Sequence, residues 1–169
     1  MKRQIALLLS ATLALAFTGL ASASTEHATG AAATVTLADA KAAQRDLWIG
    51  HIFWVRNVVE ARFDGNANEA KVAEQQVVAN AKAIAASIEP FYGKAASEKL
   101  FTLLAGHWGA ISDYLDATRA DSKSGQDSAF KQLASNADAI AVFLGGANPN
   151  LPVDVLRGLL MAHGSHHVQ

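Results

Sequence analysis

Three histidines recur at a fixed interval, and their chemistry makes them the residues of this chain best suited to hold a ligand. His51, His107 and His163 are spaced 56 residues apart, and each follows a short apolar run. Imidazole binds zinc, copper, nickel and haem iron, and it also forms hydrogen bonds inside proteins. The fixed interval indicates that one supersecondary unit is repeated. The three imidazoles therefore predict either a shared ligand site or a shared packing role.

An asparagine follows each of the first two histidines after 29 residues. Asn80 and Asn136 begin two segments, residues 80–85 and 136–141, that are identical at five positions of six. An unpaired buried ring nitrogen costs about 1–3 kcal/mol, so a buried histidine needs a partner. The simpler hypothesis is a His–Asn hydrogen bond that fixes the packing. In the alternative, the asparagines support histidines that hold a ligand.

The C-terminal segment adds another histidine to the possible ligand set. His163 and His167 are four residues apart on an expected helix, a spacing that can chelate one ion. The candidate metal ligands are thus His51, His107, His163 and His167, with zinc, copper or nickel favoured over haem. No carboxylate lies on the apolar stripes and no Glu-x-x-His pair occurs, which disfavours a ferritin-like oxidase.

Aromatic and cationic residues flank the first histidine. Trp54 is interpreted as core filling or as the wall of a pocket, and Arg56 as a solvent-facing residue or an anion contact. Both are candidate supporting residues, together with Asn80 and Asn136. The sequence contains no Ser-His-Asp elbow, phosphate-binding glycine loop or cysteine nucleophile, which favours binding over catalysis.

Apolar residues at helical spacing predict five helices and no sheet. The expected helices cover about 39–63, 68–88, 94–120 and 128–144, with a fifth that starts near Pro152. Asp121 to Asp127 is expected to be a loop. We therefore predict an all-α, antiparallel four- to five-helix bundle built from a duplicated helical hairpin.

Short connections make successive helices antiparallel, so the first, third and fifth helices should run in the same direction. Their histidines would then lie at a similar height. His51 and His107 are expected to converge across a closed bundle, whereas the position of His163 depends on where the fifth helix docks. In a solenoid-like stack, the three would instead form a row.

The N-terminus has the pattern of a cleaved secretory signal. Lys2 and Arg3 precede an apolar run, which ends in Ala-Ser-Ala at residue 23. We expect a signal peptide at 1–23, a flexible segment at 24–38 and a bundle domain at 39–169, in a periplasmic or secreted protein. Beyond the signal, no stretch is apolar enough to predict a membrane span.

Composition restricts the partners further. The expected mature chain has 12 basic and 15 acidic residues without a basic cluster, which argues against nucleic acid as a partner. The absence of cysteine excludes disulfides, thiolate metal sites and covalent c-type haem.

Between Leu47 and His163 the chain resembles a family of small, secreted, helical bacterial proteins that are largely uncharacterised. The resemblance rests on Leu47-Trp48-x-x-His51-x-x-Trp54-x-Arg56, on Pro90-Phe91-Tyr92-Gly93 and on Leu103-Leu104-x-x-His107. It extends through Asn136-Ala137-Asp138 and Asn148-Pro149. Some members carry names such as glycosyltransferase or acetylglutamate kinase, but this sequence has no nucleotide-binding strand–loop–helix.

The chain also departs from the pattern of that family. Val55 replaces a usual threonine, Ala81 and Ala83 replace a glutamine and an aspartate, and the fifth helix ends early. The sequence thus predicts an exported binding protein that holds a metal ion or small ligand through equivalent histidines. The alternative is a structural or stress-related interaction protein whose buried histidines serve packing only.

Overall fold

The computed structural model describes residues 36–167, except for the side chain of His167. The predicted signal peptide at 1–23 and nearly all of the segment at 24–38 lie outside these residues. The described helices are α1 (Leu37–Phe63), α2 (Ala67–Ser87), α3 (Glu89–Tyr92), α4 (Lys94–Arg119), α5 (Lys123–Ala147) and α6 (Val153–His167). The expected all-α bundle is confirmed.

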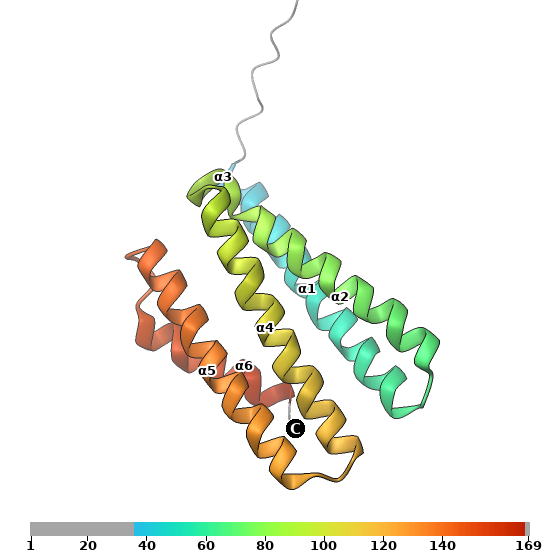
Figure 1. Cartoon of the computed structure of the whole chain (residues 1–169). Coiled ribbons are helices and arrows are strands. Elements are labelled where there is room, and N and C mark those ends of the chain that lie inside the picture. Colours follow the sequence, from blue (N-terminus) through green and yellow to red (C-terminus); the bar gives the residue numbers. More distant parts are fainter. Residues whose placement is uncertain (1–35, 168–169) are drawn as a thin grey trace, which may run out of the picture. The chain divides into compact units, whose positions relative to one another are not determined.

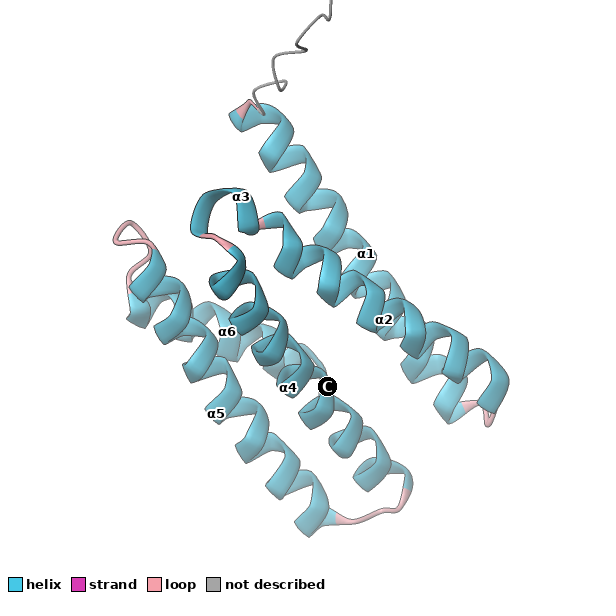
Figure 2. Ribbon diagram, turned by 45° about the horizontal axis from the view of Figure 1, so that its top comes forward, coloured by secondary structure: helices cyan, strands magenta, loops and turns pink. Residues whose placement is uncertain are grey.

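Two long hairpins form the body of the bundle. Helix α1 packs on α2, and α4 packs on α5, while α2 joins the two hairpins by packing against α4 (Figure 1). The single turn of α3 connects the hairpins. Helix α6 packs on α5 and passes behind it in both views (Figure 2). This arrangement brings the third repeated histidine back to the first two.

The first helix begins two residues earlier than the sequence analysis placed it. The Thr36 hydroxyl accepts a hydrogen bond from the backbone N–H of Asp39, and the Asp39 carboxylate accepts one from the Thr36 N–H. This capping box satisfies backbone donors that the first helical turn leaves unpaired. Residues 36–38 are therefore helix and cap rather than part of a flexible segment.

The predicted loop at 121–127 is mostly helical as well. Ser122 caps α5 by accepting a hydrogen bond from the Gly125 N–H, and Lys123 pairs with Asp127 one turn later at 2.7 Å. A serine cap followed by an i, i+4 ion pair starts a helix even where the composition suggests a loop. Only Ala120 to Ser122 connect α4 with α5.

The core lies inside each hairpin and at the contact between them. Ile84 on α2 is buried against Leu100 and Leu104 on α4, and Val58 and Val77 are fully buried between α1 and α2. Burying an aliphatic side chain contributes about 1.5–3 kcal/mol to the stability of the fold. The contact of Ile84 with α4 therefore holds the two hairpins together. The hairpins thus hold a fixed position relative to each other.

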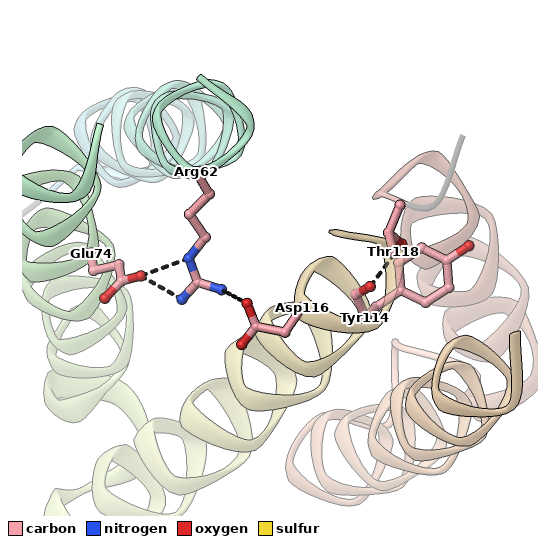
Figure 3. A network of polar contacts seen from close by, with 5 residues as sticks. All are labelled: Arg62, Glu74, Tyr114, Asp116 and Thr118. Carbon is pink, nitrogen blue, oxygen red and sulfur yellow. Dashed lines mark hydrogen bonds and ion pairs between the residues drawn. The ribbon is translucent and has the colours of Figure 1, made fainter. Parts of the chain in front are cut away.

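An ion-pair network reinforces that position away from the histidines. Arg62 at the end of α1 reaches Glu74 on α2 and Asp116 on α4 (Figure 3). Its Nε donates to Glu74 Oε1 at 2.9 Å, its Nη1 donates to Asp116 Oδ1 at 3.3 Å, and its guanidinium lies 6.0 Å from the Trp108 ring. One side chain therefore links three helices.

The outer surface keeps several large apolar side chains exposed, among them Ile49, Ile52 and Phe53 on α1. None of the described helices is both long and apolar enough to cross a membrane.

Candidate functional site

The three repeated histidines converge. The His163 ring on α6 lies 5.9 Å from the His107 ring on α4, stacked nearly parallel to it, and 6.2 Å from the His51 ring on α1. These distances join ring centroids. His51 and His107 are buried, and His163 is half-buried. The docking of α6, which the repeat pattern left open, thus brings His163 between the other two imidazoles.

In the second repeat, Asn136 holds the imidazole of His107. Its amide nitrogen donates to the backbone carbonyl of Leu103 at 2.9 Å, and its Oδ1 lies 3.1 Å from His107 Nδ1. Because Oδ1 can only accept, Nδ1 carries the proton and Nε2 carries the lone pair of the neutral ring. The expected His–Asn hydrogen bond is confirmed here, with the added function of tying α5 to α4.

The first repeat has the same tether but leaves the imidazole unpaired. Asn80 donates to the Leu47 carbonyl at 2.9 Å, as Asn136 does to its own hairpin. However, His51 Nδ1 and Asn80 Oδ1 are both buried and neither has a hydrogen-bond partner, although Asn80 still acts to raise the pKa of His51. The two groups are therefore close neighbours that do not form a hydrogen bond. The repeats therefore differ at this one contact.

A glycine before each of the first two histidines makes room for the asparagine. A Cβ at Gly50 would lie 3.3 Å from Asn80 Nδ2, and one at Gly106 would lie 3.1 Å from Asn136 Nδ2. The amide passes over the glycine to reach the helix backbone. In the third unit the equivalent residue is Ala162, which is exposed. The Gly-His pair was visible in the sequence, but the contact that explains it was not.

All three imidazoles are held neutral. Burial lowers the pKa of His107 to about 4, and the hydrogen bond that His107 donates to Asn136 only partly opposes this effect. Burial also lowers the pKa of His51, as does the neighbouring His163. The pKa of His163 is lowered by burial and then by His166. Neutral imidazoles can accept a hydrogen bond or a metal ion without first losing a proton.

The three histidines line an apolar cavity of about 270 Å³. The cavity is lined by repeat-equivalent positions: His51, His107 and His163, then Trp48, Leu104 and Leu160 one turn earlier, then Gln44 and Leu100, with Ile84, Ile88, Ile140 and Leu144 from α2 and α5. The lining is therefore arranged in layers, and in each layer α1, α4 and α6 contribute residues from equivalent positions of the repeat. Sequence reasoning missed the cavity, although the 56-residue period marks most of its lining.

Trp48 and Gln44 contribute an aromatic ring and an amide to the lining. The Trp48 ring meets the His51 ring edge-on at 5.5 Å and is 41% exposed. The Gln44 amide nitrogen donates to the Ser87 hydroxyl at 2.6 Å, which fixes its side chain to α2. The cavity thus has an aromatic wall and one neutral amide in its lining.

Two of the predicted supporting residues lie elsewhere. Trp54 packs against the buried Val55–Val77 cluster, and Arg56 is exposed and paired with Glu60 at 2.7 Å. Neither residue lines the cavity. Trp54 follows His51 by almost one helical turn, on the side away from Trp48, and packs into the core between α1 and α2 instead, whereas Arg56, five positions after His51, points to a different face of α1. Their flanking position in sequence therefore does not place them beside the imidazoles.

The described side chains do not include a ready-made metal centre. Among them, no group of three His, Asp or Glu residues has the spacing that a metal ion requires. His167, the fourth predicted ligand, ends α6, and its side chain is outside the described part.

No protein-family model, no curated protein sequence and no solved structure matches this chain.

Proposed function

We propose that this protein is an exported binding protein that holds a small, mainly apolar molecule in the cavity between α1, α4 and α6. The observation that carries the proposal is the convergence of three neutral imidazoles on one apolar cavity. Small-molecule sites are concave and apolar with a few polar groups that orient the ligand, which describes this cavity. Its volume of about 270 Å³ suits a molecule the size of a substituted benzene ring.

The proposal is tested by filling the cavity. Leu160 lines it, whereas its neighbour Leu159 is 65% exposed on the same helix. We expect 4-propylphenol to raise the melting temperature of the unmodified protein, since a ligand that binds only the folded state stabilises it. Leu160→Trp should abolish this rise, and Leu159→Trp should retain it. An equal rise in all three proteins would mean that the probe binds elsewhere.

A transition-metal ion is the second candidate, because Asn136 fixes the tautomer of His107 as supporting residues do for metal-bound histidines. Two histidines on one zinc have ring centroids about 5 Å apart, as follows from Zn–N bonds of about 2.0–2.1 Å. The observed separations of 5.9 and 6.2 Å are longer, so this candidate requires the rings to approach. Metal analysis of untagged protein, with and without His51→Ala, tests it.

If neither an apolar molecule nor a metal ion binds, the histidines serve packing alone. In that case, substitutions at the imidazoles would change stability and nothing else.

A further inference from the structure

The direction in which the imidazoles present their protons restricts what the cavity can bind. In the second repeat, the Asn136 amide group is oriented by the Leu103 carbonyl, so its Oδ1 faces His107 Nδ1 as an acceptor. His107 therefore holds its one proton on Nδ1, and the lone pair is on Nε2. The asparagine thus decides that this ring acts as a hydrogen-bond acceptor at its other nitrogen.

The same argument applies to His51 in the first repeat. Asn80 is oriented by the Leu47 carbonyl in the same way, and its buried Oδ1 has no donor. A bare Nδ1 beside that oxygen would bring two lone pairs together, so the proton of His51 belongs on Nδ1. His51 is 7% exposed and lines the cavity, and Nδ1 is its buried nitrogen. Nε2, which carries the lone pair, is the nitrogen left for a ligand.

The rest of the lining contains no ionised group. No Asp, Glu, Lys or Arg is among the described residues that line the cavity. A carboxylate or phosphate would meet lone pairs and hydrocarbon without a cation, and a protonated amine would meet no carboxylate. Moving such a charge into an apolar site without a partner is strongly unfavourable. The cavity therefore selects against ionised ligands of either sign.

We infer that the ligand class is a neutral, mainly apolar alcohol or phenol, whose hydroxyl donates to Nε2 of His51 while its hydrocarbon body contacts Leu104, Leu160 and Trp48. This inference rests on the proposed function, since it names the ligand of the same cavity. The hydroxyl gives Nε2 of His51 a hydrogen-bond donor, and the aliphatic and aromatic walls contact the rest of the molecule.

Three probes with one skeleton separate the possibilities: 4-propylphenol, its methyl ether 4-propylanisole, and 4-propylbenzoate. Their affinities for the purified protein are measured by calorimetry at pH 7.5. We expect the phenol to bind about tenfold more tightly than the ether, the effect of one hydrogen bond. The benzoate should bind at least tenfold more weakly than the phenol. In His51→Phe, the affinity of the phenol should fall to that of the ether, and the affinity of the ether should change little.

The comparison of probes in the unmodified protein stands even if His51→Phe fails to fold. Equal binding of phenol and ether would overturn the inference and leave the cavity proposal intact. Tightest binding of the benzoate would also overturn it. If none of the probes binds, the proposed function fails together with its ligand class. Stoichiometric uptake of Zn²⁺ that excludes the phenol would assign the imidazoles to a metal instead.

Discussion

His107 donates its Nδ1 proton to Oδ1 of Asn136 across 3.1 Å, and the same asparagine donates to the backbone one turn before the histidine. One side chain therefore joins the two helices of a hairpin and decides which nitrogen of the imidazole is an acceptor. The first hairpin has the tether without the imidazole bond. This difference between two repeats of one sequence pattern provides a matched pair for experiment.

Asn136→Ala should destabilise the protein by about 1–3 kcal/mol, because it leaves the buried Nδ1 of His107 without an acceptor. Asn80→Ala should cost less, since His51 Nδ1 has no partner to lose. Both asparagines are half-buried, so the two substitutions remove similar packing. Denaturant unfolding measures the two losses. Equal values would contradict the asymmetry of the repeats.

The proton position of His107 is itself observable. Nitrogen-15 spectra at pH 7.5 should show the neutral ring with the proton on Nδ1, because Asn136 Oδ1 accepts it. Asn136→Ala removes that acceptor and should shift the ring towards the Nε2–H tautomer. A ring that is protonated on Nε2 in the unmodified protein would refute this assignment.

Gly106→Ala tests the close approach of the asparagine. Replacing an exposed helical glycine by alanine normally adds about 0.5–1 kcal/mol of stability. The new Cβ would lie 3.1 Å from Asn136 Nδ2, which should cancel that gain, whereas Gly109 has open space and Gly109→Ala should show the gain in full. In an Asn136→Ala background, Gly106→Ala should also become stabilising. The double-mutant cycle is read from unfolding midpoints.

Acid should destabilise the folded state. The pKa of His107 is lowered to about 4 in the folded protein, against about 6.5 in the unfolded chain. Below pH 6.5 the histidine is protonated in the unfolded state but stays neutral in the folded state. The free energy of unfolding therefore falls by up to about 3 kcal/mol as the pH approaches 4. Burial also lowers the pKa of His51 and His163, which acts in the same direction.

Denaturant unfolding at pH 7.5 and pH 4.5 measures this loss. His107→Gln cannot take up the proton, so its stability should depend less on pH than that of the unmodified protein. An unchanged pH dependence in His107→Gln would exclude His107 as the source.

The ion pairs of Arg62 should be unequal. Glu74 is more buried than Asp116, with side-chain exposures of 34% and 64%, and it receives two guanidinium nitrogens. Glu74→Gln should therefore cost about 1 kcal/mol, and Asp116→Asn less than about 0.5 kcal/mol, as for exposed pairs. The exposed Lys94–Glu98 pair provides a control that should be near neutral on Glu98→Gln. Thermal melting at low and high salt distinguishes the pairs.

The spacing of apolar residues was enough to predict the hairpins. An apolar stripe on a helix must be buried, and short connections place the stripes of consecutive helices against each other. The same pattern placed two helix starts wrongly, because a polar capping contact determines where each of these helices begins. Thr36 with Asp39, and Ser122 with Gly125, begin helices in stretches whose composition suggests loops. A capping hydrogen bond depends on the position of a single side chain, so the composition of the segment does not reveal it.

The sequence by itself determined that His51, His107 and His163 occupy equivalent positions on helices, because a 56-residue repeat of helical pattern places each at the same point of its unit. It could not determine that α6 folds back over α5, since that depends on packing between elements distant in the chain. Only the tertiary structure brought the third imidazole to the others, formed the apolar cavity that they line and paired Asn136, but not Asn80, with its histidine. Such contacts are set by side-chain positions within an ångström, which a repeat pattern does not specify.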